Sequence, residues 1–196
     1  MVGCSRGQYS WSIQLHSVRK SHILTVVPHT HAVSPSSSIP ELQKTEGHVV
    51  IITSSAAQVR IPNMSEYCIS KHAINRFVEF IGIGNSYLLY LDSPLFCSLS
   101  TRFRFAEYPD LKVFSVHPGT IKTALYDEFG GGETKFPLSA TVGLSAATVL
   151  YLTAGKADYL SGRYISSTWD LGEVERDWKE KIVTQNCLVN KLSIPE

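Results

Sequence analysis

The sequence of 196 residues lacks an excess of charge of either sign, because 18 Lys and Arg residues stand against 17 Asp and Glu residues. Binding to nucleic acid or to an anionic membrane through charge needs a basic surface, so this balance argues against both partners. The four cysteines are scattered without a Cys-x-x-Cys pair, which argues against a disulfide framework and a zinc site. We therefore expect a protein of a reducing compartment, the cytoplasm.

Long hydrophobic runs are also scarce. The longest stretch without a charged residue covers residues 136–155, and it contains Pro137 and several Ser and Thr residues. A membrane-spanning helix of this length is normally more uniformly apolar. We expect a buried helix of a soluble protein here, and no membrane contact.

Acidic residues are absent from residues 1–40, which are rich in serine. We expect residues 1–38 to be a disordered leader outside the folded domain; a mitochondrial transit peptide or an error of the gene model are the alternatives. Four histidines lie here without a carboxylate or thiol nearby, so we expect solvated side chains and no metal site: His16, His22, His29 and His31.

The most informative stretch that is present runs from Gly47 to Ile81. Residues 49–52 form a β-branched run typical of a strand buried on both faces of a parallel sheet, and Ser54 and Ser55 follow it. A helical pattern then begins near Met64, with apolar residues at helical spacing: Ile69, Ile74, Phe77, Val78 and Ile81.

Tyr67 and Lys71 stand four residues apart in this predicted helix and so share one face. A cation near a phenol oxygen favours the phenolate form, which suits a group that transfers protons near neutral pH. A hydroxyl of the serine pair, at the carboxyl end of the adjacent strand, could hold a carbonyl oxygen for that proton. A second Tyr-x-x-x-Lys pair, Tyr108 and Lys112, has Pro109 after the tyrosine and lacks such a helix.

The later part of the chain predicts further alternation of strands and helices. Residues 112–117 and 162–166 indicate strands, whereas residues 139–153 and 173–183 indicate helices. The first of these strands ends at Pro118 and Gly119. The order of the elements predicts an α/β protein with a parallel sheet.

These residues resemble the short-chain dehydrogenase/reductase family, and the likeness is greatest to fungal members. In that family a strand ends in a serine pair, Tyr-x-x-x-Lys follows about a dozen residues later on a helix, and Pro-Gly and a threonine follow the next strand. The matching residues are Ser54, Ser55, Tyr67, Lys71 and the segment Pro118–Thr123. The resemblance covers roughly residues 39–81 and 106–190 and implies a Rossmann-like, doubly wound parallel sheet.

The resemblance also implies the role of each residue. Ser55, Tyr67 and Lys71 match the catalytic residues of an NAD- or NADP-dependent oxidoreductase that interconverts an alcohol and a carbonyl, with Ser54 as the alternative serine. Tyr67 and Lys71 also match residues that contact the cofactor. The further cofactor positions are Pro118, Gly119, Ile121 and Thr123. A small-molecule alcohol or carbonyl substrate is expected, and a homo-oligomer as in the family is compatible with the resemblance.

Features of the family's cofactor half are missing. No asparagine precedes Asn63, and no glycine-rich turn follows a predicted strand. We therefore expect residues 39–190 to be a partial domain, the C-terminal half of the fold with about three strands, that carries an insertion at residues 82–105. An inactive truncated or mis-spliced family fragment, at most an interaction module, is the alternative function.

Overall fold

The computed structural model describes residues 12–18, 21–27, 42, 44, 47–82, 111–129 and 136–193. The strands are β1 (Ser12–Val18), β2 (Ser21–Val27), β3 (His48–Ile52), β4 (Lys112–His117) and β5 (Arg163–Ser166). The helices are η2 (Ser55–Gln58), α2 (Ser65–Gly82), α4 (Ala124–Phe129), α5 (Val142–Leu152), η5 (Asp158–Leu160), α6 (Leu171–Glu173), the π-helical turn η6 (Val174–Trp178) and α7 (Lys179–Thr184).

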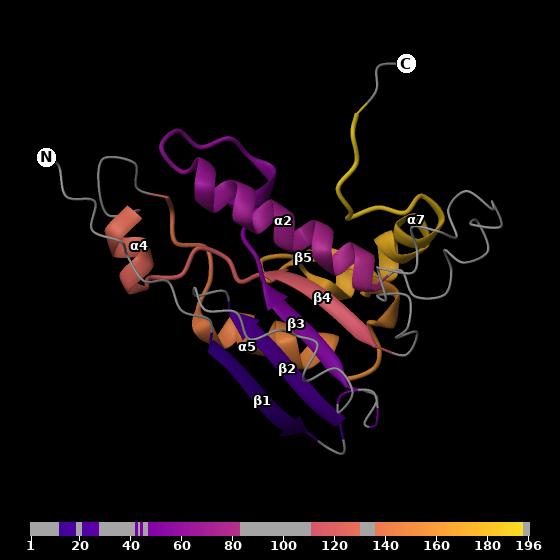
Figure 1. Cartoon of the computed structure of the whole chain (residues 1–196). Helices are drawn as coiled ribbons and strands as arrows, with labels where there is room; N and C mark the ends of the chain where they lie inside the picture. The colour runs from indigo at the N-terminus through magenta and orange to yellow at the C-terminus, as the bar shows by residue number, and fades with distance from the viewer. Residues whose placement is uncertain are drawn as a thin grey trace, which may run out of the picture.

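The described strands form one sheet in the order β1-β2-β3-β4-β5. β2, β3, β4 and β5 are parallel to their neighbours, whereas β1 pairs antiparallel with β2 and places Val18 opposite Ser21. The connection from β3 to β4 contains α2, and the connection from β4 to β5 contains α4, α5 and η5. Helices lie on both sides of the sheet in Figure 1, with α2 on one side and α5 on the other.

Alternate residues of the strands serve two separate hydrophobic cores. Val49 and Ile51 pack with Val78 and Ile81 of α2, whereas Val50 packs with residues of α5, β5 and the last helices on the other face. Side chains of a strand point alternately to the two faces of a sheet, so a run of apolar residues needs both faces covered. The α/β, doubly wound class that the sequence predicts is confirmed.

The predicted helix that carries Tyr67 is confirmed as α2, but the face that it buries differs from the one that the apolar pattern predicts. Ile69 is 68% exposed, whereas Lys71, Asn75 and Glu79 are buried. These three polar residues are spaced by four, so they lie along one side of the helix. A count of apolar residues could not identify this face because polar residues occupy part of it.

The structure differs from the sequence prediction at the amino terminus. β1 and β2 lie within residues 1–38, where we expected a disordered leader, and the sheet has five strands rather than about three. The reason is visible in Ser21–Val27, where four of the seven residues are apolar and the backbone pairs with β3 from Ile23 to Val26. The predicted insertion covers residues 82–105. Its first residue, Gly82, is the last residue of α2, and residues 83–105 lie outside the described residues.

Candidate active site

The candidate site lies where three parallel strands end. Thr53 donates from its backbone nitrogen to the carbonyl of Val116 at 2.9 Å, and Ser167 donates likewise to His117 at 2.9 Å. These bonds continue the pairing of β3, β4 and β5 just beyond the strand ends. The serine pair after β3 and the Pro118-Gly119 turn after β4 are therefore brought to the same edge of the sheet.

Lys71 is the charged group at the centre of this edge. Its side chain is buried, and its ammonium group donates a hydrogen bond of 3.1 Å to the carbonyl of Ile52, the last residue of β3. The Nζ atom lies 5.6 Å from the centre of the Tyr67 ring. Burial lowers the pKa of Lys71 to about 8, because removing water disfavours the charged form.

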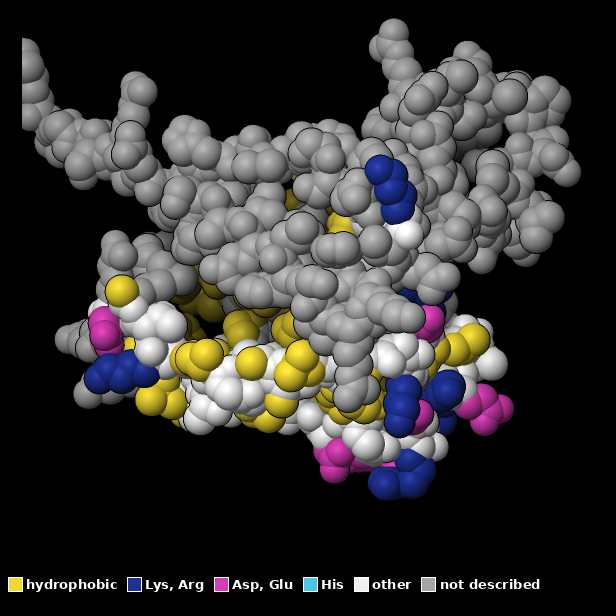
Figure 2. Space-filling view, turned by 90° about the horizontal axis from the view of Figure 1, so that it is seen from below, with side chains coloured by type: hydrophobic (Ala, Val, Ile, Leu, Met, Phe, Trp, Pro, Cys, Tyr) yellow, Lys and Arg dark blue, Asp and Glu magenta, His cyan; other side chains and the backbone are white. Residues whose placement is uncertain are grey.

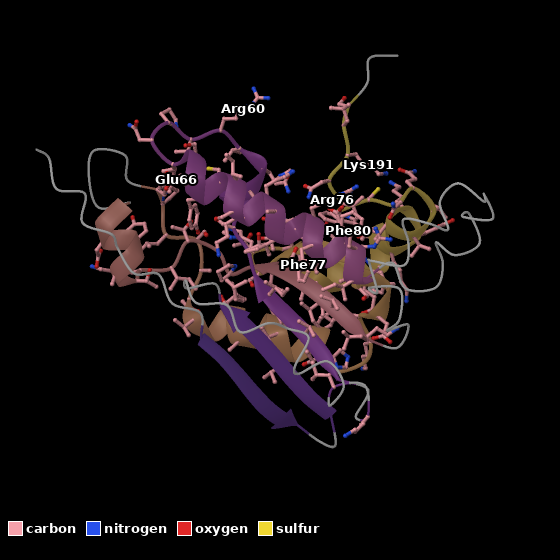
Figure 3. All side chains as sticks on the ribbon, viewed as in Figure 1. Arg60, Glu66, Arg76, Phe77, Phe80 and Lys191 are labelled. Atoms are coloured by element: carbon pink, nitrogen blue, oxygen red, sulfur yellow. The ribbon has the colours of Figure 1, made fainter. Side chains whose placement is uncertain are left out.

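Two further contacts fix the first turns of α2 over the end of β3. The hydroxyl of Thr53 donates to the backbone carbonyl of Lys71 at 3.3 Å, and the His72 ring nitrogen Nδ1 lies 2.9 Å from the carbonyl of Ala57 in η2. Figure 3 labels Glu66 near the beginning of the helix, beside the loop that carries Arg60. Tyr67, one residue further, is half-buried on the same turn.

The two serines have different surroundings. Ser54 is the N-cap of η2, and its hydroxyl oxygen accepts a hydrogen bond of 3.2 Å from the backbone nitrogen of Ala56. Ser55 begins the helical turn and is exposed. The Ser54 hydroxyl is therefore engaged in holding the turn, whereas the Ser55 side chain faces solvent.

The segment that begins at Pro118 is held from the opposite side by the residues that precede and begin α5. The hydroxyl of Ser145 donates to the carbonyl of Pro118 at 2.8 Å, and the hydroxyl of Ser139 accepts from the backbone nitrogen of Thr120 at 2.8 Å. Gly119 has a φ of +85°, and a Cβ atom there would lie 2.4 Å from the Cβ atom of Ala140. This position therefore needs glycine for its backbone conformation and for space.

Thr123 and Ile121 follow in the same segment. The hydroxyl of Thr123 accepts a hydrogen bond of 3.2 Å from the backbone nitrogen of Tyr126, so it caps α4. Ile121 is half-buried and Thr123 is exposed. The structure thus places all the predicted residues on the segments that meet at this edge, and it gives Thr123 a second, structural use.

His117 is a residue at this edge that the sequence analysis did not select. It ends β4, its Nδ1 atom is buried without a hydrogen-bond partner among the described residues, and burial lowers its pKa. Its position directly before Pro118 was a signal that could have drawn attention to it. A buried imidazole with a lowered pKa is mainly neutral at pH 7.

Comparison with known proteins gives matches over much of the chain. The sequence profile of the family described as short chain dehydrogenase matches residues 16–82. The short chain dehydrogenase pigC of Monascus ruber is 32% identical over 133 residues, which cover 64% of this chain and 35% of that protein. The short chain dehydrogenase pgmD of Aspergillus terreus (strain NIH 2624 / FGSC A1156) is 28% identical over 167 residues, which cover 80% of this chain and 45% of that protein. The chain thus spans less than half the length of these two relatives.

Matches among solved structures have a lower identity and TM-scores below 0.5. The KRED1-Pglu enzyme is 20% identical, with a TM-score of 0.47, over 66% of this chain and 51% of that one. The angucycline C-6 ketoreductase LanV with bound NADP is 20% identical, with a TM-score of 0.45, over 69% of this chain and 49% of that one. The profile match and the sequence relatives thus support a likeness of this chain to the short-chain dehydrogenase/reductase family, over part of the length of those relatives.

Proposed function

We propose that this chain is an NAD- or NADP-dependent oxidoreductase that interconverts an alcohol and a carbonyl compound, with Tyr67 as the acid and base. The main support is the position of Lys71, a buried ammonium group 5.6 Å from the centre of the Tyr67 ring. A cation within about 6 Å of an aromatic ring centre is attracted to the ring, so this contact holds the two side chains together. Tyr67 would give a proton to a carbonyl oxygen in reduction and take one from an alcohol in oxidation.

Ser55 would orient the substrate oxygen. Its side chain is exposed at the same edge, whereas the hydroxyl of Ser54 accepts a bond from Ala56. A hydroxyl that already serves as a helix cap is less free to donate to a ligand. We therefore assign the substrate contact to Ser55 rather than to Ser54.

The described residues offer contacts for the nicotinamide end of the cofactor. The ammonium group of Lys71 has three hydrogens. Among the described residues it donates one hydrogen bond, to Ile52, so ribose hydroxyls could accept from the other hydrogens. Tyr67, the segment Pro118–Ile121 and Thr123 would complete the contacts. The nicotinamide, when bound, would supply or accept the hydride.

The other end of the cofactor has no candidate among the described residues. A dinucleotide pyrophosphate is commonly held at a glycine-rich turn between a strand and a helix. Here β1 and β2 are antiparallel neighbours with Val18 opposite Ser21, which is not a strand-helix-strand unit. This observation favours the second candidate function, a family fragment that lacks activity and acts at most as an interaction module.

Cofactor binding separates the two candidates. We expect NADPH or NADH fluorescence to change on addition of the chain, and a panel of ketones and aldehydes to be reduced. Tyr67→Phe should lower kcat/KM by roughly 10²-fold to 10⁴-fold. Tyr159→Phe is the matched control, because the Tyr159 hydroxyl is buried without a partner among the described residues and lies on η5. Absence of binding at about 1 mM cofactor would favour the inactive fragment.

The proposal also covers the cellular location and the oligomeric state of the protein. Among the described helices none is long and apolar enough to cross a bilayer. We propose a cytoplasmic enzyme that acts on a small molecule, and a homo-oligomer is compatible with its family. Gel filtration of the purified chain tests the oligomeric state.

A further inference from the structure

The peptide group between Pro118 and Gly119 is not held in one orientation by its own two residues. Gly119 has a φ of +85°, and an added Cβ atom would lie 2.4 Å from the Cβ atom of Ala140, so the position requires glycine. Glycine adopts positive and negative values of φ about equally well. This peptide group is therefore free to rotate unless another part of the chain holds it.

Ser145 of α5 provides such a hold. Its hydroxyl donates a hydrogen bond of 2.8 Å to the carbonyl of Pro118, and among the described residues no second donor bonds to this oxygen. Thr120 is held more firmly. Its carbonyl accepts from the backbone nitrogens of Ser139 and Ala140 at 3.0 and 3.4 Å, and its own nitrogen donates to the Ser139 hydroxyl at 2.8 Å. Loss of one side chain leaves other bonds at Thr120, whereas the carbonyl of Pro118 depends on Ser145 alone.

The beginning of α5 fixes the place of the Ser145 hydroxyl. Thr141 is the N-cap of this helix, and its side chain accepts a hydrogen bond of 3.2 Å from the backbone nitrogen of Leu144. A serine within a helix often donates to the carbonyl four residues before it, and the Ser145 hydroxyl lies 3.4 Å from the carbonyl of Thr141. A hydroxyl has only one hydrogen. The shorter distance to Pro118 therefore indicates that the hydrogen is directed out of the helix.

The orientation of this peptide group decides which polar group the segment presents. The peptide is trans, so the N–H of Gly119 points opposite to the carbonyl of Pro118 and therefore away from Ser145. No described residue accepts a hydrogen bond from this nitrogen. A rotated peptide would present a carbonyl oxygen, an acceptor, where the N–H donor now lies. A ligand that contacts this segment would then meet the reverse hydrogen-bonding pattern.

Ser145 and the proposed catalytic residues belong to different helices. Tyr67 and Lys71 lie on α2, whereas Ser145 lies on α5, and Figure 1 shows these two helices on opposite sides of the sheet. The bond of Ser145 reaches the segment after β4, and the bond of Lys71 reaches the end of β3. A change at Ser145 should therefore alter the segment after β4 without displacing Tyr67 or Lys71.

We infer that Ser145 is a positioning residue for the nicotinamide end of the cofactor, because it fixes the orientation of the peptide group between Pro118 and Gly119. The inference rests on the proposed function, which assigns Pro118 and Gly119 to the cofactor site. Ser145 acts through this peptide group and does not itself contact the cofactor. Its loss weakens cofactor binding and leaves proton transfer by Tyr67 unchanged.

Amide NMR of the full chain tests the hold without any cofactor. In Ser145→Ala the Gly119 amide signal should shift and broaden, because the peptide group then samples two orientations. Ser145→Thr keeps the hydroxyl and should restore the wild-type signal. Thr153→Ala is the matched control, because it removes a hydroxyl at the end of the same helix that donates to the carbonyl of Val149 at 2.9 Å. An unchanged Gly119 signal in Ser145→Ala would overturn the inference.

Titration with NADPH and NADH tests the consequence for binding. Ser145→Ala should raise the cofactor dissociation constant by roughly threefold to tenfold, as loss of one hydrogen bond does, while kcat at saturating cofactor stays within about twofold of the wild-type value. Ser145→Thr should restore the affinity, and Thr153→Ala should leave it unchanged. If wild type binds cofactor and Ser145→Ala binds it equally well, this inference alone is overturned. If wild type binds neither cofactor at about 1 mM, the proposed function is overturned together with the inference.

Discussion

Ser54 and Ser55 are neighbours at the end of β3, yet their hydroxyl groups have different tasks. The Ser54 oxygen satisfies the backbone nitrogen of Ala56 at the start of η2, whereas the Ser55 side chain is exposed. From the sequence alone either serine could be the one that contacts a substrate. The structure gives a physical reason to assign them different roles, because the Ser54 hydroxyl caps η2 and so stabilises the fold.

We predict that alanine substitutions separate these tasks. Ser54→Ala should lower the free energy of unfolding by about 1 kcal/mol, the usual cost of losing a cap, and should reduce turnover much less. Ser55→Ala should leave the free energy of unfolding nearly unchanged and lower kcat by roughly 10²-fold, as loss of a positioned hydrogen-bond donor does. Urea unfolding and steady-state kinetics measure the two effects, and the reverse pattern would assign the substrate contact to Ser54.

At the scale of elements, α2 and β5 approach each other at a pair of glycines. A Cβ atom on Gly82, the last residue of α2, would lie 2.1 Å from the Cα atom of Gly162, directly before β5. Gly162 has a φ of +78°. The absence of side chains at both positions lets the end of the helix lie against the start of the strand.

We predict that Gly82→Ala lowers the free energy of unfolding by about 1–3 kcal/mol, because the added methyl group overlaps a backbone that cannot easily move. Gly143→Ala in α5 is the control, since its nearest neighbour to an added Cβ is the Thr141 hydroxyl at 3.8 Å. That variant should raise stability by about 0.5–1 kcal/mol through the better helix propensity of alanine. Similar effects of both substitutions would show that the close approach is absent.

The sequence predicts those elements whose local pattern agrees with their environment. Lys112–His117 is predicted and observed as a strand, and the helix that carries Tyr67 begins at Ser65, one residue after the predicted start. The Ser55, Tyr67 and Lys71 positions follow from the same local pattern. A local pattern does not predict long-range packing: β2 pairs with β3 through the backbone, and Glu79 of α2 accepts a hydrogen bond from the backbone nitrogen of Asn190 in the C-terminal segment.

At the scale of the whole molecule, the two faces of the sheet are covered unequally. α2 buries polar as well as apolar residues, whereas α5 buries Thr148 and Leu152 and leaves Val142, Leu144 and Leu150 exposed. Figure 2 shows hydrophobic side chains gathered across the middle of the described surface, where α5 lies. α5 is therefore less buried than α2, although α5 has the more apolar composition. A count of apolar residues alone would predict the opposite.

Buried titratable groups in different parts of the molecule together determine how its free energy of unfolding depends on pH. Burial lowers the pKa of Lys71 from 10.5 to about 8, so between these values the unfolded chain binds a proton that the folded chain does not. Stability then rises with pH in that window. Burial also lowers the pKa of His48 and His117, so stability falls as the pH drops below about 6.5.

Tyr151 and Tyr164 have the opposite effect at high pH. Burial raises the pKa of each to about 12, with a further contribution from Glu175 at Tyr151. Above pH 10 the unfolded chain loses phenol protons that the folded chain keeps, so stability falls. The groups together predict a maximum of stability near pH 10, rather than near pH 7.

We predict a rise in the free energy of unfolding between pH 8 and pH 10 that depends on Lys71. Its slope is at most about 1.4 kcal/mol per pH unit, the value for one proton. Lys71→Met keeps a long, unbranched side chain without the titratable group, so its free energy of unfolding should be nearly flat over the same range. Urea unfolding at intervals of half a pH unit gives both curves. Parallel curves for wild type and Lys71→Met would show that Lys71 does not titrate in this window. That result would contradict the burial of its ammonium group beneath α2 at the end of β3.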